Sequence, residues 1–434
     1  MLNQIIEEAE RNISKYCDEY EIFAENLKLL ELDAQKSDLS FAKQEINLGI
    51  GIRVIQDNKL GFAFTSDMNK ISETAEKAYS NAKLNQEDSN FAFAEKSSYP
   101  KIKNNYDKKN EELELDEMTS FMENILNTVE EKGCKPTSGG FSRGSGEEII
   151  LNSNGVKASE KSTGFGAYIA VNAFKKDEFS SAYDSISSCN YDFNGEELAE
   201  KVSQLAIDSV GGENIDTGDK EVVLDYNAAT GLLNTFMSGF NADNVQRGRS
   251  ILKDKVDQSI VSENLSIYDD GTIDAGLSSS KFDGEGTPSQ KTELVKDGVL
   301  KGFIYDIYTA NKAKIKSTGN GFRGSYSSTP GVSSSNIILD FNKMTKIDEI
   351  DNGIIATDLL GAHTANPISG DFSVEVNNGF LIENGEITKP IKKAMISGNV
   401  FETFKNCEAI DSQIKQYGSF ILPKILLHNL RVIG

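Results

Sequence analysis

The sequence predicts an α+β protein, in which an N-terminal domain of mixed helices and strands precedes a mostly antiparallel β domain, a sheet or a barrel. Helical spacing of apolar residues dominates the first half of the chain. Asp-Gly and Asn-Gly turns between short apolar runs dominate the second half. A polar stretch rich in glycine and aspartate, 212–220, separates the halves. We therefore place the domains at residues 1–212 and 213–434.

Helices are predicted in the first half where apolar residues recur at helical spacing. Asn194, followed three positions later by Glu197, forms a capping box that marks the start of the last of them. Gly211-Gly212 ends that helix. The other three predicted helices cover 2–17, 70–83 and about 116–132.

Strands are predicted between these helices, and turn residues indicate how they pair. Asp57-Asn58-Lys59 joins two strands, and Ser153-Asn154-Gly155 joins another two. Residues 85–112 are polar and are expected to form a long solvated loop or an excursion from the domain. The predicted strands are 20–32, 47–56, 60–64, 147–152, 156–162, 167–174 and 178–183.

The second half begins with one clear helix, about 227–241, which buries an apolar stripe containing Leu232, Leu233 and Phe236. Short strands follow it. Asp297-Gly298 and Asn384-Gly385 each separate two apolar runs. Repeated hairpins of this kind are typical of an antiparallel sheet or barrel.

Charge and cysteine content limit the classes of function. Lys plus Arg total 45 against 67 Asp plus Glu, a formal net charge of −22. This charge repels phosphates and anionic lipids, so we expect neither nucleic-acid binding nor membrane docking. The four cysteines are dispersed, and the N-terminal residues are acidic and amphipathic, unlike a secretory signal. A cytoplasmic location with reduced thiols is the simplest interpretation.

Histidine is scarce, which constrains metal chemistry. The chain has only His363 and His428, whereas hydrolytic zinc sites usually take two or three histidines. We expect His363 to be a hydrogen-bonding loop residue and His428 to be half-buried on a strand. Acidic pairs such as Asp269-Asp270 offer carboxylates for a divalent cation, but solvated faces and turns explain most of them in so acidic a chain.

Two glycine-containing patterns suggest other chemistry only weakly. Residues 140–144 match GxSxG, but no helix is expected after Ser142, so we interpret the match as a flexible turn rather than a serine-hydrolase elbow. Segment 281–331 mixes glycines, hydroxyls and aromatics. Such strands can accept an extended peptide at a sheet edge, although tight turns at sheet corners are the simpler interpretation.

A series of short motifs resembles the TldD/PmbA family in order along nearly the whole chain. Each motif is only moderately specific, but the ordered set is strong. The motifs are GIRV at 51–54, GFA at 61–63, Thr65-Ser66, VQRGRS at 245–250, FDGEGTP at 282–288, DGVL at 297–300, STGN at 317–320, GDFS at 370–373, ENGE at 383–386 with Pro390, and SGN at 397–399.

The resemblance implies a two-subunit metallopeptidase that acts on unfolded or extended peptides. In this family the TldD-type subunit carries a helical HExxxH motif and a later cysteine as zinc ligands. The TldE or PmbA type has a similar fold but lacks them. The family's older name, modulator of DNA gyrase, does not imply contact with DNA.

Aligned by this resemblance, the HExxxH positions hold Asn234, Thr235 and Gly239. Where the ligating cysteine is expected, the chain reads QYGSF at 416–420, and Cys407 does not match. The resemblance therefore implies no catalytic residue and no metal site here, and a non-catalytic subunit that trims or degrades peptides together with a zinc-bearing partner.

Three questions stay open on sequence grounds. The partner is either a TldD-type subunit in a heterodimer or a second copy in a homodimer. The alternatives to a non-catalytic subunit are a self-contained metallopeptidase with an atypical site near His363, and a homodimeric scaffold that binds peptides. No substrate-contact residue is identified, and segments 281–331 and 361–385 are the first places to look.

Overall fold

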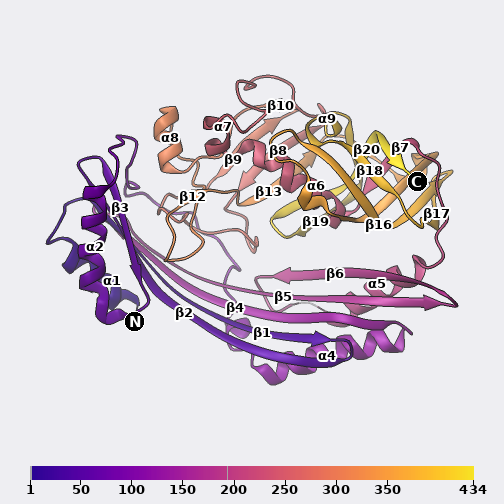
Figure 1. The fold of residues 1–434 in the computed structure, drawn as a ribbon, viewed down its shortest axis with the longest axis horizontal. Helices are drawn as coiled ribbons and strands as arrows, with labels where there is room; N and C mark the ends of the chain where they lie inside the picture. Colours follow the sequence, from indigo (N-terminus) through magenta and orange to yellow (C-terminus); the bar gives the residue numbers. More distant parts are fainter. Residues whose placement is uncertain (1, 193) are drawn as a thin grey trace.

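The computed structural model describes residues 2–192 and 194–434. It contains two large β structures, a long curved sheet from the first half of the chain and a more compact, partly closed one from the second half (Figure 1). The predicted α+β class is confirmed, with antiparallel sheets and a barrel in the C-terminal half.

The first sheet is antiparallel throughout, with strand order β3-β2-β1-β4-β5-β6. Consecutive strands join through short turns, except that three α-helices and a 3-10 turn intervene between β3 and β4. The strands are β1 (Tyr20–Gln35), β2 (Asp38–Gln56), β3 (Lys59–Thr65), β4 (Lys135–Asn152), β5 (Lys157–Lys175) and β6 (Glu178–Ser188).

Two of these strands are far longer than the sequence predicts. β2 begins at Asp38 rather than near residue 47, and β4 begins at Lys135 rather than near 147. The added stretches are polar or rich in glycine and serine, so they lack the alternation that marks a strand. They are extended because each pairs along its length with β1. The GxSxG match lies inside β4, so our interpretation of it as a turn is wrong.

Four helices cover one face of the first sheet (Figure 1). α1 and α2 pack on the half near β3, and α4 and α5 pack on the other half. The side chain of Asn194 caps α5 as predicted, because it accepts hydrogen bonds from the backbone N–H groups of Glu196 and Glu197. The helices are α1 (Leu2–Ile13), α2 (Ile71–Leu84), α3 (Lys108–Glu111), α4 (Leu115–Glu131) and α5 (Gly195–Asp208).

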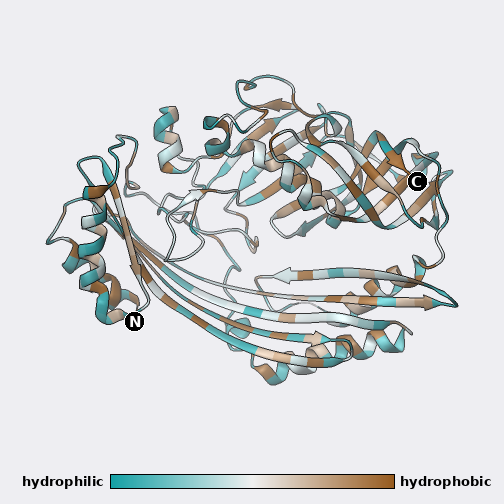
Figure 2. Ribbon diagram, in the orientation of Figure 1, coloured by the Kyte–Doolittle hydropathy of each residue, from teal (hydrophilic) through white to brown (hydrophobic). Residues whose placement is uncertain are grey.

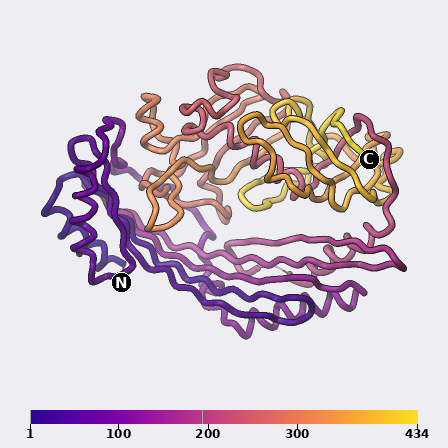
Figure 3. The backbone as a smooth tube through the Cα atoms, in the orientation of Figure 1, coloured from indigo at the N-terminus to yellow at the C-terminus, as the bar shows by residue number. Residues whose placement is uncertain are grey.

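The chain leaves α5 and enters the second β structure near the C-terminus (Figure 3). There β20 pairs with both β18 and β7, which closes a barrel through β16 and β15. The barrel strands are β7 (Gly218–Leu224), β15 (Asn352–Leu360), β16 (Asp371–Glu383), β18 (Met395–Asn399) and β20 (Phe420–Ile433).

The sheet continues from β20 through β13, β8, β9 and β10, and β14, β17 and β19 pair with it off this path. The strands are β8 (Leu265–Asp270), β9 (Lys291–Lys296), β10 (Val299–Leu300), β13 (Asn336–Phe341), β14 (Met344–Thr345), β17 (Glu386–Pro390) and β19 (Cys407–Tyr417). β11 (Gly321–Phe322) and β12 (Gly331–Val332) form a separate pair. The helices are α6 (Tyr226–Met237), α7 (Ala242–Gln246), α8 (Ile307–Ala313) and α9 (Val400–Thr403).

Two of the predicted hairpin turns have the backbone conformation that their residue types favour. Asn384 and Gly385, between β16 and β17, have φ values of 52° and 81°. Asp297 and Gly298, between β9 and β10, have φ values of 45° and 80°. Two consecutive positive φ angles suit the right-handed twist of the flanking strands, which explains the preference for Asn or Asp followed by Gly.

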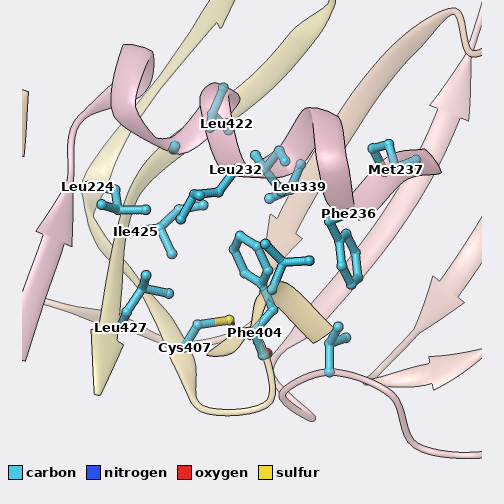
Figure 4. Close-up of a cluster of buried hydrophobic side chains, with 14 of the residues drawn as sticks. Leu224, Leu232, Phe236, Met237, Leu339, Phe404, Cys407, Leu422, Ile425 and Leu427 are labelled. Carbon is cyan, nitrogen blue, oxygen red and sulfur yellow. Dashed lines mark hydrogen bonds between the residues drawn. The ribbon is translucent and has the colours of Figure 1, made fainter. Parts of the chain in front are cut away.

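The largest hydrophobic core lies in the second half, between α6 and the surrounding strands. Figure 2 shows hydrophobic residues along the barrel strands, and Figure 4 shows the side chains that α6 inserts among them. The Phe236 ring lies 5.2 Å from Phe404 and 5.3 Å from Phe240, measured between centroids. These aromatic contacts pack α6 against the end of α9 and against the turn that follows α6.

Segment 85–107 contacts both halves of the molecule, so of the two predicted forms it is an excursion and not a solvated loop. Phe93 and Ala94 are buried, and Asn152 of β4 donates a hydrogen bond to the Ala94 carbonyl at 2.8 Å. The tyrosine hydroxyl of Tyr99 donates to the Gly286 carbonyl at 3.0 Å. The sequence shows a polar segment, but these few apolar side chains fill a seam that exists only in the folded molecule.

A buried ionic cluster also joins the halves. Glu21 of β1 is fully buried and accepts hydrogen bonds from Arg53 of β2 and from Arg323, which follows β11. Arg53 also lies 3.5 Å from Glu285. Arg53 is therefore held by carboxylates from both halves of the chain, and Glu21 holds Arg323 of the second half, so these ion pairs link the two β structures.

No helix in the described part of the chain has the length and apolar character needed to cross a membrane.

Candidate functional site

Helix α6 is the element on which the family's metal motif is expected. Asp225 caps its N-terminus by accepting a hydrogen bond from the Tyr226 N–H. Leu232, Leu233 and Phe236 face the core, so the opposite face, with Asn227 and Asn234, is turned outward. The helix ends at Met237, and a 3-10 turn (Ser238–Phe240) follows, so the predicted helix to residue 241 is too long.

The three positions that correspond to HExxxH are not equivalent in the structure. Asn234 is exposed, Thr235 is 8% exposed, and Gly239 is buried in the 3-10 turn. A Cβ atom at Gly239 would lie 3.1 Å from the Phe401 ring and 3.2 Å from Leu252. A histidine side chain at this position would therefore require Phe401 and Leu252 to move. Asn, Thr and Gly also lack the imidazole and carboxylate donors that zinc prefers.

The two histidines lie apart and have ordinary environments. His363 is exposed on a 3-10 turn (Ala362–Thr364) that contacts α6, since a Cβ atom at Gly231 would lie 2.8 Å from the Ala362 Cβ. His428 is half-buried on β20, as predicted, and its Nδ1 lies 2.5 Å from Glu221 of β7. The described residues contain no group of three or more His, Cys, Asp or Glu side chains arranged to hold a metal ion.

Cys407 also does not suit metal binding. Its thiol is 1% exposed within the core beside Phe404, whose carbonyl it contacts at 3.3 Å (Figure 4). Burial, with a smaller effect of Glu408, raises the pKa of this thiol to about 12. The group is therefore a protonated thiol at neutral pH, whereas a zinc ligand is a thiolate. Taken together, these positions do not fit the zinc site that the resemblance assigns to a TldD-type subunit.

A cavity of about 970 Å³ lies between the two β structures, beside the N-terminus of α6. One wall consists of β6 and α5, and the other of the start of α6 with residues from β15, β16, β17, β19 and β20. Asn227 belongs to this wall, and its side chain donates to Asp358 at 3.1 Å. Asn234 lies two helical turns further along the same face of α6.

Charged and aromatic groups line the cavity. Asp184 and Lys201 form an ion pair at 2.5 Å on the β6 and α5 wall. Lys424 lies 3.8 Å from Asp225 on the opposite wall. Tyr417 stands where the ligating cysteine is expected, and burial raises its pKa above the usual value for tyrosine. Such walls offer hydrogen bonds and apolar area to a polar chain that enters between them.

The sequence identified this cavity only in part. Of the two segments singled out for substrate contact, 361–385 reaches it through Phe380, whereas no residue of 281–331 lines it. The wall formed by β6 and α5 was missed. Its only signal is the alternation along β6, where Tyr183, Ser185 and Ser187 share one face.

Sequence profiles of one family match three consecutive parts of the chain. Domain 1 of the PmbA/TldA metallopeptidases matches residues 20–82, and their central domain matches 108–210. Their C-terminal domain matches 217–434, about half of the chain.

Individual relatives agree with this match. The uncharacterized protein MJ0231 of Methanocaldococcus jannaschii is 38% identical over 399 residues, 92% of each chain. The metalloprotease PmbA of Escherichia coli O157:H7 is 24% identical over 396 residues, covering 89% of this chain and 85% of that protein. The crystal structure of TldE from Thermococcus kodakarensis superimposes with a TM-score of 0.92 over 99% of this chain and 100% of that one, at 26% identity.

Proposed function

Since the chain belongs to the PmbA/TldD metallopeptidase family, we propose that it is the non-catalytic, TldE-type subunit of a two-subunit peptidase. The observation that carries this proposal is the packing at the HExxxH positions. Gly239 lies against Phe401 and Leu252, and Asn234 and Thr235 supply neither a zinc ligand nor a general base. The catalytic zinc then belongs to a TldD-type partner subunit.

The contribution of this chain is to help hold an extended peptide substrate. The cavity beside α6 supports this role because its two walls come from separate β structures and offer hydrogen-bonding side chains on both sides. A peptide lying between them would meet Tyr417 on one wall and Ser187 on the other. We place the complex in the cytoplasm, where the four buried, unpaired thiols would stay reduced.

The first prediction concerns metal content and activity. We expect the purified chain alone to contain well under one zinc per molecule and to show no chelator-sensitive peptidase activity. Mixed with an HExxxH-bearing subunit from the same genome, it should yield chelator-sensitive hydrolysis of unfolded peptides. Elemental analysis of the chain and a fluorogenic peptide assay of both preparations measure these outcomes.

Two other results would contradict the proposal in different ways. Stoichiometric zinc with chelator-sensitive hydrolysis by the chain alone would indicate a self-contained peptidase with an atypical site. Peptide binding by a homodimer, without hydrolysis in the presence of any HExxxH-bearing subunit, would indicate a peptide-binding scaffold.

A further inference from the structure

Three glutamates lie side by side on the face of the first sheet that is turned toward the second β structure. Glu25 of β1 is directly opposite Glu148 of β4, and Glu148 is directly opposite Glu160 of β5. Directly opposed residues on neighbouring strands have Cβ atoms about 4.5–5.5 Å apart. We call these residues the glutamate row. Like charges in this arrangement destabilise a sheet, so the row requires a physical explanation.

The carboxylates of the row are only partly satisfied by the protein. Glu160 accepts hydrogen bonds from the Ser280 hydroxyl and from the Lys281 N–H. Glu25 accepts one from the Tyr326 N–H, but its Oε1 atom has no partner although the residue is 2% exposed. Glu148 is partly exposed, and no hydrogen bond to its carboxylate is present among the described residues.

The neighbouring cations do not neutralise the row. Arg323 directs its N–H groups to Glu21 and to the carbonyls of Gly284 and Ser328. Arg53 directs its N–H groups to Glu21 and Glu285. Arg323 acts on the row only from a distance, and Arg53 directs no N–H group to it, so the row keeps an excess of negative charge.

Burial and mutual repulsion both affect the pKa values of the glutamates in the row. Burial raises the pKa of Glu148 to about 7, with further increases from Glu25 and Glu160 and an opposing effect of Arg323. Burial also raises the pKa of Glu25. A positive charge placed against the row would relieve this repulsion, whereas nothing in the described part of the chain supplies one by direct contact.

An open surface of small residues leads away from the row. Gly144 of β4 and Gly164 of β5 are directly opposite each other, and a Cβ atom added to either would meet no atom closer than 3.9 Å. Their lack of side chains is therefore not required by internal packing. Glycine within a strand often marks a place where another backbone approaches closely. We call this surface the glycine–serine floor; its residues are Ser142, Gly144, Ser162, Gly164 and Gly166, whereas the Leu27 side chain covers Gly146.

The floor connects the row to the cavity described above. Ser142 is opposite Gly166, which is opposite Ser187 of β6, a residue that lines the cavity. From Glu148 to Ser142 the strand advances six residues, or about 20 Å. This distance matches six residues of an extended peptide. β4, β5 and β6 run beneath the second β structure over this length (Figure 1).

We propose that the glutamate row binds a protonated amine of an extended peptide whose backbone lies on the glycine–serine floor. The amine is either the terminal ammonium of the peptide or a lysine side chain. This inference rests on the proposed function, since it names the chemical class of peptide that the subunit favours.

The geometry favours an ammonium group over a metal ion. The three carboxylates are arranged in a line across three strands rather than around one point, and the described residues include no group arranged to hold a metal. An ammonium has three N–H donors, so it can bridge the free Oε1 of Glu25 and the carboxylate of Glu148.

The second prediction tests this site with matched variants. Glu148→Gln removes the central charge, and Glu147→Gln removes the adjacent charge on the opposite face of β4. Three fluorescein-labelled octapeptides serve as probes: one with a free N-terminus and no lysine, one acetylated with a single lysine, and one acetylated without lysine. Binding to the full-length chain is measured by fluorescence anisotropy at pH 7.5.

We expect the two amine-bearing peptides to bind wild type and Glu147→Gln alike, and Glu148→Gln at least about tenfold more weakly. The acetylated peptide without lysine should bind weakly and equally to all three proteins. Whichever amine-bearing peptide shows the loss identifies the source of the ammonium. If both amine-bearing peptides bind Glu148→Gln as tightly as they bind wild type, the inference is wrong and the proposed function is unaffected.

A stability measurement separates loss of binding from misfolding. The raised pKa of Glu148 means that wild type loses stability as the pH rises from about 4.5 through about 7. Glu148→Gln should therefore unfold at a higher temperature than wild type at pH 8 and at a similar temperature at pH 4.5. A lower unfolding temperature at pH 8 would contradict the repulsion on which the inference depends.

A small probe tests the row even if no octapeptide binds. L-lysinamide should raise the unfolding temperature of wild type at pH 7.5 but not that of Glu148→Gln. If the octapeptides fail to bind and this shift occurs, the proposed function is wrong and the amine site stands. If lysinamide causes no shift in wild type, the amine site is wrong.

Discussion

Replacing Glu21 with glutamine should lower the free energy of unfolding by about 3–5 kcal/mol, because it leaves buried positive charge without its compensating partner. Glu21 is fully buried, and its two carboxylate oxygens lie 2.8 Å and 2.6 Å from the Nε and Nη2 atoms of Arg53. Its Oε1 also lies 2.5 Å from Arg323 Nη2. Glutamine has nearly the same shape, so the change removes charge without opening a cavity. Urea denaturation at pH 7, followed by circular dichroism, measures the difference.

Glu73→Gln provides the control for this measurement. Glu73 forms an ion pair with Lys77 at 2.6 Å, but both side chains are more than half exposed. Surface pairs of this kind contribute about 0–1 kcal/mol. If Glu21→Gln lowers the free energy of unfolding by no more than Glu73→Gln does, the buried ionic cluster does not hold the two β structures together.

Restoring the family's metal motif should fail for a steric reason. We expect the triple variant Asn234→His, Thr235→Glu, Gly239→His to bind less than one zinc per chain and to unfold more readily than wild type. A Cβ atom at Gly239 already lies 3.1 Å from Phe401, so an imidazole must displace the aromatic packing around Phe236 and Phe404. Overpacking a core costs about 1–3 kcal/mol, and burying a polar ring without partners adds to this.

The double variant without the Gly239 change is the control. Asn234 is exposed, so a histidine there meets no packing constraint, whereas Thr235→Glu tests the effect of a buried carboxylate. Thermal unfolding and elemental analysis of both variants measure the result. One tightly bound zinc in the triple variant, with an unchanged unfolding temperature, would show that absence of the ligands alone, and not the packing of α6, prevents metal binding.

These two predictions depend on contacts between residues that are distant in sequence. Glu21 and Arg323 are 302 positions apart, and Gly239 and Phe401 belong to different elements of the C-terminal core. No pattern of neighbouring residues in the sequence predicts such pairs. The same holds for the glutamate row, whose three members align only because β1, β4 and β5 pair in one register.

Local patterns predicted the features that depend on local physics. The spacing of apolar residues identified α1, α2, α4 and α6, and Asn-Gly and Asp-Gly identified the turns after β16 and β9. Both signals are properties of a few consecutive residues, since helix amphipathicity and positive φ angles are specified within a turn or two of chain. The ordered motifs also sufficed to identify the family.

Only the folded chain shows that 38–46 and 138–146 are strands, that segment 85–107 fills a seam, and that β6 and α5 form one wall of the cavity. The reason is that backbone hydrogen bonds to a neighbouring strand can extend a sheet through polar and glycine-rich residues whose own side chains give no preference for it. The sequence by itself therefore determines which functional side chains the chain has. Long-range strand pairing determines which of these side chains lie close together in the folded protein.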